Sequence, residues 1–147
     1  MELDYYQRQK RLLQHDYQSD LEKVLFILSL SDKHETWTIK DIQRLVIPPL
    51  KLNQYRIYAD KEVPLCYASW AMLPEEAEEG YKNRTRKIQP HDWNSGDNLW
   101  LIDVICPFGG TRIAIKRLDN LRKELGLPNK VNFKRLGSNR VNNVERI

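Results

Sequence analysis

The segment from Leu99 to Ile105 reads LWLIDVI, and it sets one carboxylate, Asp103, inside an otherwise apolar run. Its β-branched and aromatic residues, bounded by Gly96 before it and by Pro107 after it, predict a core strand. A buried carboxylate without a partner is costly, so Asp103 requires either a partner or a chemical task. Because functional sites often break local sequence rules, this strand constrains the fold and marks a candidate site.

The rest of the chain alternates between helical and strand-like patterns of apolar residues. The first predicted elements are a peripheral polar helix over 1–19, a helix over 20–28 capped by Asp20, and a short helix opened by a capping box of Thr38 and Asp41 and ended by Pro48 and Pro49. A hairpin of strands 54–59 and 63–73, an acidic helix over 75–83 and the Asp103 strand follow. The last two elements are a strand over 130–136 and, before it, an amphipathic helix over 111–125 whose apolar positions are Ile113, Ile115, Leu118, Leu121 and Leu125. The polar residues 137–147 are expected to form a tail without fixed structure. This order favours an α+β fold with a mixed sheet flanked by helices.

Length and composition favour one soluble domain. The chain has 147 residues, of which 41% are hydrophobic and 30% charged. No apolar run approaches the roughly 18 to 20 residues that a membrane span requires, and the first residues lack the pattern of a secretion signal. We therefore expect a single domain over 1–147 in the cytoplasm.

Cys66 and Cys106 both lie in apolar, strand-like context without metal-ligand spacing. We expect two reduced thiols and no metal site. A nucleophilic role for Cys106 is the sharper alternative, but a buried structural cysteine is the commoner case.

The net charge is +4, and basic residues are concentrated after Gly110. A basic face attracts acidic partners, although a solvated surface is the usual use of such residues. Nucleic acid is a less favoured partner than an acidic protein.

Five short motifs point to a known family. They are NQY at 53–55, Y-x-S-W-A at 67–71, W-x-S-G-D at 93–97, W-x-I-D at 100–103 and P-F-G at 107–109. Together they closely resemble the RTX toxin-activating lysine acyltransferases over about residues 21–124. The resemblance implies a GNAT-like fold and transfer of a fatty acyl group from acyl carrier protein to internal lysines of an RTX-type protoxin. It also implies a homodimer and no permanently bound cofactor.

The resemblance also implies the site residues. Ser31, His34 and Trp37 match the family's Ser-x-x-His-x-x-Trp spacing, which makes His34 the catalytic histidine and Asp103 the catalytic aspartate. A lysine ammonium must lose a proton before it attacks a thioester, and histidine is the base that is neutral near pH 7. Asp103 would orient the imidazole, stabilise its charged form or attract the lysine. Ser31 would protonate the departing thiol or donate a hydrogen bond.

The turn after the Asp103 strand is the candidate donor site. Phe108, Gly109, Gly110 and Arg112 would receive the phosphate of phosphopantetheine or the thioester oxygen through backbone amides and charge. This loop is shorter than the one that binds coenzyme A in ordinary GNAT enzymes, which favours acyl carrier protein as donor. The basic face from Arg112 to Lys134 would dock that carrier.

Several alternatives remain open. Ser31 could be a turn residue, and Asp103 could pair with Arg112. An acyl-enzyme on Ser31 or His34 could precede transfer. Trp70 and Trp100 suit either the core or an acyl channel, and Leu45 stands where the family has an asparagine. The whole chain could act on another amine, or serve as an inactive binding module with a basic face.

Overall fold

The computed structural model describes residues 17–134 and 141–145 of the chain. Most of the peripheral helix predicted over 1–19 lies outside these residues. Tyr17 begins the first described helix and is buried in the core, so residues 17–19 belong to that helix and not to a separate peripheral one.

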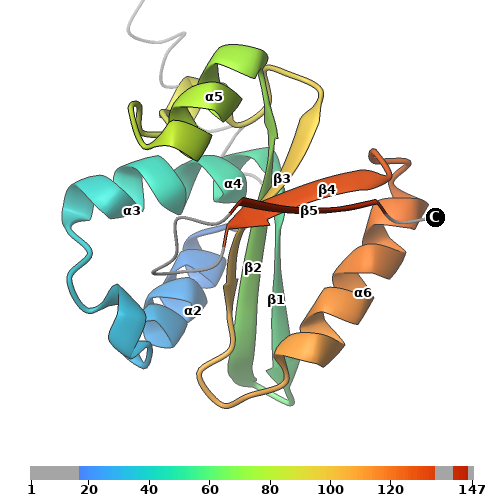
Figure 1. The fold of residues 1–147 in the computed structure, drawn as a ribbon. Helices are drawn as coiled ribbons and strands as arrows, with labels where there is room; N and C mark the ends of the chain where they lie inside the picture. The colour runs from blue at the N-terminus through green and yellow to red at the C-terminus, as the bar shows by residue number, and fades with distance from the viewer. Residues whose placement is uncertain (1–16, 135–140, 146–147) are drawn as a thin grey trace, which may run out of the picture.

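A five-stranded mixed sheet forms the centre of the molecule (Figure 1). Its strands lie side by side in chain order: β1 (Tyr55–Asp60), β2 (Val63–Leu73), β3 (Asn98–Ile105), β4 (Lys130–Lys134) and β5 (Val141–Glu145). Neighbouring strands are antiparallel except β3 and β4, which are parallel. The predicted α+β class with a mixed sheet is confirmed.

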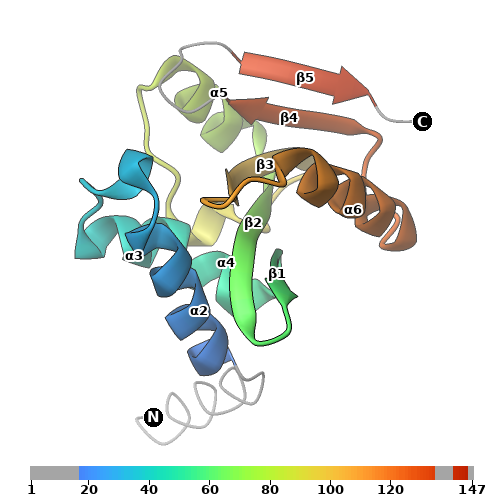
Figure 2. The same ribbon diagram turned by 90° about the horizontal axis from the view of Figure 1, so that it is seen from below.

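Helices cover both faces of the sheet. The helices α2 (Tyr17–Ser29), α3 (Ile39–Leu45), α4 (Ile47–Leu52) and α5 (Glu75–Asn83) lie on one side, and α6 (Thr111–Glu124) crosses the other (Figures 1 and 2). We call these the α2 face and the α6 face. The α6 helix connects the parallel strands β3 and β4, as a parallel connection requires.

A bulge in β3 changes which side chains reach each face. Ser69 of β2 opposes Asp103, but the next residue, Trp70, opposes Leu101, which leaves Ile102 as an extra residue. Residues two apart in a regular strand share a face. Because of the bulge, Asp103 lies on the α2 face with Ser69, whereas Leu101 lies on the α6 face with Trp70.

The sheet opens beside Asp103. In the described part of the chain, β3 pairs with β4 through Trp100–Asn132 and Leu101–Phe133 and through no later residue of β3. The half of β3 that carries Asp103 therefore has β2 on one side and no strand on the other among the residues that the structure describes.

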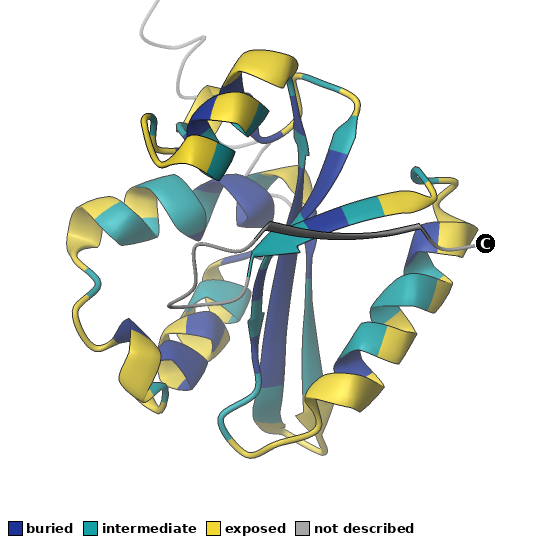
Figure 3. Cartoon of the chain, in the orientation of Figure 1, coloured by how far each residue is buried: buried dark blue, intermediate teal, exposed yellow. Residues whose placement is uncertain are grey.

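Two apolar clusters hold the α2 face together, and the dark blue segments of Figure 3 trace them. The first joins Val24 and Ile27 of α2 to Tyr67 and Ile105 of the sheet. The second packs Ala77 of α5 and the loop residue Trp93 against Ala71, Leu73 and Trp100. The polar residues of the candidate site lie on this same covered face.

Two local predictions were wrong, and one helix was not predicted. Asp20 does not cap its helix, which already begins at Tyr17; its carboxylate instead accepts a hydrogen bond from the Tyr55 hydroxyl. The helix opened by Thr38 and Asp41 ends at Leu45, before Pro48 and Pro49 as predicted, but these prolines then stand in the first turn of the additional helix α4, where proline is tolerated because its missing N–H has no helical partner. Residues 141–145 form β5 along β4, within the tail predicted to lack structure.

The other predicted elements are confirmed, with small changes of boundary. Thr38 and Asp41 form the expected capping box at the start of α3. In α6, Ile113 and Leu125 are 62% and 51% exposed, so these two predicted apolar positions do not contribute to the core.

Among the helices described here, none is long and apolar enough to cross a membrane.

Candidate active site

His34 lies in a short 3₁₀ turn, Asp32–His34, between α2 and α3. The Ser31 Oγ atom lies 2.5 Å from its Nδ1 atom, and the Trp37 ring packs edge-on against the imidazole with centroids 4.7 Å apart. In the Ser-x-x-His-x-x-Trp motif, the serine and the tryptophan therefore both contact the histidine ring and fix its orientation.

The opposite side of the His34 ring faces the sheet and Asp103. The His34 Nε2 atom lies 3.9 Å from Asp103 Oδ1, and the two residues are 7% and 8% exposed. This separation exceeds the hydrogen-bond range of about 2.7–3.2 Å. The structure thus brings Ser31, His34 and Asp103 together in one row, and Asp103 faces His34 instead of the alternative partner Arg112.

Two further polar residues, Tyr67 and Ser69, lie on the same face and were not singled out from the sequence as site residues. Both are fully buried, and Ser69 stands directly across from Asp103 in the sheet. The Tyr67 hydroxyl, Ser69 Oγ, Asp103 Oδ2 and His34 Nε2 are all buried without a hydrogen-bond partner among the described residues. Buried polar atoms normally have partners, so this concentration marks a site built to meet other groups. The period-two spacing of Tyr67 and Ser69 opposite the Asp103 strand was the signal for them in the sequence.

Tyrosines near Asp103 have raised pKa values. Burial raises the pKa of Tyr67, and the Asp103 carboxylate adds to this. The same two causes, in the same order, raise the pKa of Tyr81, a residue of α5. Both phenols therefore stay neutral across the ordinary pH range.

Tyr81 also links Trp100 to β4. Its ring packs edge-on against Trp100 at 5.2 Å, and the Lys134 Nζ atom lies 3.8 Å from its centroid. The Trp100 Nε1–H donates to Glu78 of α5 at 3.3 Å. Trp100 is thus a core residue of the α2 face, whereas Trp70 lies on the α6 face beside a cavity.

The loop after β3 has the backbone of a tight strand-to-helix turn. Gly109 and Gly110 adopt φ values of 93° and 89°, a region that favours glycine, and Gly110 caps α6 without a side-chain hydrogen bond. Phe108 is 59% exposed, and Arg112 is exposed in the first turn of the helix. The four predicted donor-site residues therefore form an open surface at the end of β3.

The predicted basic face is smaller than the sequence suggested. Arg112, Lys116 and Arg117 are exposed, and Arg117 lies over the Tyr58 ring at 5.4 Å. Arg122, however, is buried and pairs with Asp119 at 3.1 Å, and Lys134 is turned onto Tyr81. Arg122 and Lys134 therefore do not belong to the accessible basic face, which keeps Lys123 and Lys130 beyond the first half of α6.

Both described cysteines are free, as predicted. Cys66 is buried and Cys106 is half-buried. Burial, with the neighbouring Cys106 thiol, raises the pKa of Cys66 to about 12. A neutral thiol is a poor nucleophile. Across the residues that the structure describes, no cluster of three histidine, cysteine or acidic side chains is placed to hold a metal ion.

A mixed sheet that opens beside a buried histidine and aspartate, followed by a glycine turn into a helix, defines a GNAT-like acyltransferase architecture. The model of the RTX toxin acyltransferase family, HlyC, matches residues 13–147. The chain belongs to this family, as its motifs predicted.

Curated relatives agree with this assignment. The chain is 33% identical over 107 residues to the RTX-II toxin-activating lysine-acyltransferase ApxIIC of Actinobacillus pleuropneumoniae. The matched residues cover 73% of this chain and 66% of the relative. It is 33% identical over 103 residues to the protein-lysine myristoyltransferase RtxC of Kingella kingae, covering 70% and 62%. It is 36% identical over 89 residues to the protein-lysine myristoyltransferase HlyC of Escherichia coli, covering 60% and 52%. The matches thus span between about half and two thirds of these relatives.

Proposed function

We propose that this chain transfers a fatty acyl group from the thioester of acyl carrier protein to lysine side chains of an RTX-type protoxin. The observation that carries the proposal is the His34 imidazole, buried between Ser31 and Asp103 with Nε2 free of any described hydrogen-bond partner. Relatives named as protein-lysine myristoyltransferases support a fatty acyl group as cargo.

In this proposal His34 is the general base. Nε2 must be unprotonated to accept a proton, so the other ring nitrogen carries the hydrogen and Nδ1–H donates to Ser31 Oγ, 2.5 Å away. Ser31 is then a positioning residue that fixes the tautomer and the ring orientation, a role that a third group commonly plays for a catalytic histidine.

Asp103 binds the incoming amine. The His34 Nε2 and Asp103 Oδ1 atoms are 3.9 Å apart, so no hydrogen bond joins them. A lysine nitrogen can therefore contact both atoms. The carboxylate attracts the ammonium, His34 removes its proton, and the charge on the imidazolium is then balanced by the same carboxylate.

The transfer step balances without a cofactor. The lysine nitrogen forms a bond to the thioester carbonyl carbon, the carbon–sulfur bond breaks, and the thiolate of phosphopantetheine leaves. The ammonium loses two protons on the way to the amide. His34 takes the first and releases it to solvent before the attack. It then takes the second from the attacking nitrogen and passes it to that sulfur, which returns the base to its starting state. The products are an amide on the lysine and free carrier thiol.

The donor would approach along α6. The uncapped start of α6 after Gly110 offers backbone N–H groups to a phosphate, and Arg112 adds positive charge there. Acyl carrier protein, an acidic partner in the cytoplasm, would dock on Arg112, Lys116 and Arg117. A homodimer remains a prediction that sedimentation of the purified chain tests.

The experiment is an acyl-transfer assay with acyl-loaded carrier protein and an RTX protoxin fragment, read by the mass of the fragment. We expect His34→Ala to lower the rate by about 10²- to 10⁴-fold, the usual contribution of a general base. His91→Ala is the matched control, because the His91 side chain is 76% exposed. Equal rates for the two variants would reject the assignment of His34.

The two-step route through an acyl-enzyme has its own signature. If Ser31 or His34 is acylated first, the enzyme should gain the mass of the acyl group when it meets acyl carrier protein without protoxin. Direct attack by lysine leaves the enzyme mass unchanged under those conditions.

A further inference from the structure

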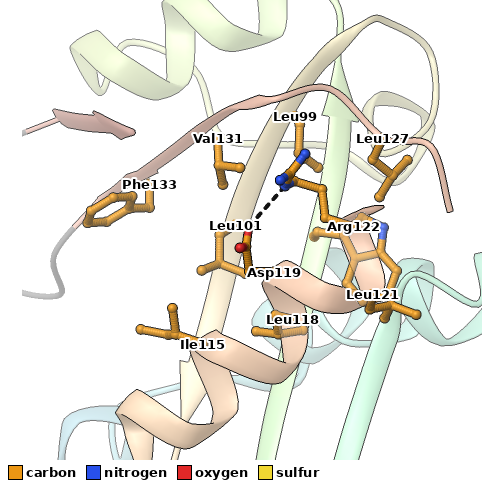
Figure 4. A pocket seen from close by; sticks show the side chains of 11 residues that line it. Leu99, Leu101, Ile115, Leu118, Asp119, Leu121, Arg122, Leu127, Val131 and Phe133 are labelled. Carbon is orange, nitrogen blue, oxygen red and sulfur yellow. Dashed lines mark hydrogen bonds and ion pairs between the residues drawn. The ribbon is translucent and has the colours of Figure 1, made fainter. Parts of the chain in front are cut away.

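An apolar cavity lies on the face of the sheet opposite to His34. It lies between α6 and the strands β3 and β4 and has a volume of about 150 Å³. Figure 4 shows that Leu101, Ile115, Leu118 and Phe133 form one end of it. Folded proteins rarely leave an apolar space of this size unfilled, because each missing contact costs dispersion energy.

A charged pair lies toward the other end of the cavity, among Leu99, Leu121 and Leu127 (Figure 4). The Arg122 Nε atom lies 3.1 Å from Asp119 Oδ1 and its Nη1 atom 3.0 Å from the Asn129 side chain, while its Nη2 atom is buried without a hydrogen-bond partner among the described residues. A hydrocarbon offers this guanidinium no hydrogen bond. The cavity thus has apolar walls, an apolar end and an end that carries a charged pair.

The apolar end lies next to the candidate active site through β3. Leu101 lines the cavity, and Asp103, two residues later, faces His34 because of the bulge at Ile102. Past the Leu101–Phe133 pair, β3 has no described neighbour on the β4 side. A flexible chain that starts beside Asp103 can therefore pass around this edge of β3 into the cavity.

We propose that this cavity holds the far end of the fatty acyl chain and that the Asp119–Arg122 pair sets the limit to its length. The inference rests on the proposed function. An apolar cavity of about 150 Å³ accommodates a six-carbon ring. About six terminal carbons of the chain fit here, while the carbons nearer the thioester occupy the opening beside Asp103.

Filling the cavity tests the proposal. Ile115→Phe adds bulk at the apolar end, and Val131→Phe adds it from β4 if the first variant fails to fold. Ile113→Phe is the matched control, because Ile113 lies in the same helix and is 62% exposed. Each variant receives an equal mixture of acyl carrier proteins loaded with chains of different length, and the products are measured by mass.

We expect the filled variants to shift the preferred chain shorter by about two carbons, since a phenyl ring displaces roughly that much hydrocarbon. The Ile113→Phe variant should keep the wild-type preference. An unchanged preference in folded Ile115→Phe and Val131→Phe would overturn the proposal.

A binding measurement separates this inference from the proposed function. Tetradecyl-pantetheine, a thioether that cannot react, is added to protein with labelled methyl groups, and methyl signals are followed by NMR. Signals of Ile115, Leu118 and Val131 should move, and that of Ile113 should not. If these methyl signals move but the wild type transfers no acyl group, the proposed function is rejected and the cavity remains a site for the acyl chain. If the signals do not move, the cavity is rejected as the site of the chain.

Discussion

Asp103 is the residue at which the cost of a buried charge and the proposed chemistry meet. Its Oδ2 atom has no described hydrogen-bond partner, and its closest described cation is a histidine that is charged only when protonated. A purely structural carboxylate would be better satisfied, since an unpaired buried charge destabilises a fold. We therefore interpret the missing hydrogen-bond partner of Asp103 as a loss of stability that the proposed activity requires.

This interpretation predicts opposite effects on stability and activity. Asp103→Asn keeps the shape and removes the charge, so the urea midpoint should stay equal or rise, while acyl transfer falls by about 10²-fold or more. The control Asp60→Asn, at an exposed position of β1, should change neither quantity. A clear loss of stability in Asp103→Asn would instead identify the carboxylate as structural.

Tyr67 and Tyr81 predict how stability depends on pH. Their pKa values are raised in the folded state, mainly by burial, so the unfolded chain releases these protons first. Stability is complete below the unfolded value near 10 and decreases as pH rises above it, by about 1.4 kcal/mol per tyrosine for each pH unit. Urea unfolding between pH 8 and pH 11 measures this loss, and Tyr67→Phe should make it shallower. An equally steep loss in that variant would contradict the assignment.

The sequence predicted much of the candidate site, but through motifs and not through spacing in the fold. The strand pattern marked Asp103, but the identities of Ser31 and His34 came from the resemblance, because no local pattern shows that a turn after α2 meets the middle of β3. Tyr67 and Ser69 were passed over because a buried tyrosine and serine in a strand look like ordinary core residues until their unpartnered hydroxyls are seen.

Among the elements, those governed by local chemistry were predicted well. The capping box of α3 and the hairpin of β1 and β2 both follow from short-range preferences. The errors came from longer-range effects. The helix that follows α3 and contains Pro48 and Pro49 was not predicted, and the polar residues of β5 form a strand because β4 offers them a free edge.

The W-x-S-G-D motif has a structural explanation. The backbone N–H groups of Ser95 and Gly96 both donate to the Met72 carbonyl, which ties the loop to the end of β2. A Cβ atom on Gly96 would lie 2.2 Å from the Leu73 carbonyl oxygen and from the Pro74 nitrogen. These are backbone atoms, so they cannot move aside as a side chain would.

Gly96→Ala should therefore destabilise the fold by about 3 kcal/mol or more, at the upper end of overpacking effects. The comparison is Gly126→Ala, where φ is 66° and nothing lies within 4 Å of the new Cβ atom. That variant should cost about 1 kcal/mol, the strain of a left-handed backbone. Urea unfolding of both variants measures the difference, and similar costs would contradict the proposed clash.

The arrangement of charge over the molecule predicts how the carrier docks. If acyl carrier protein binds the start of α6, Arg112→Ala and Lys116→Ala should raise its KM several-fold, and added salt should reduce the difference from wild type. Lys51→Ala, at the end of α4 on the other face, is the control. Initial rates at two salt concentrations measure these effects. A KM that rises equally in all three variants would place the carrier elsewhere.

The extra residue at Ile102 makes β3 a boundary between two separable properties. Leu99 and Leu101 before it face the cavity and Asp103 after it faces His34, so substitutions can alter cargo and chemistry independently. A one-residue deletion or insertion in the regular part of β3 behaves differently from any substitution, since it would turn the residues on one side of it to the opposite face of the sheet. Among descendants of such a chain, we therefore expect variation in side chains along β3 to be tolerated far more readily than variation in its length.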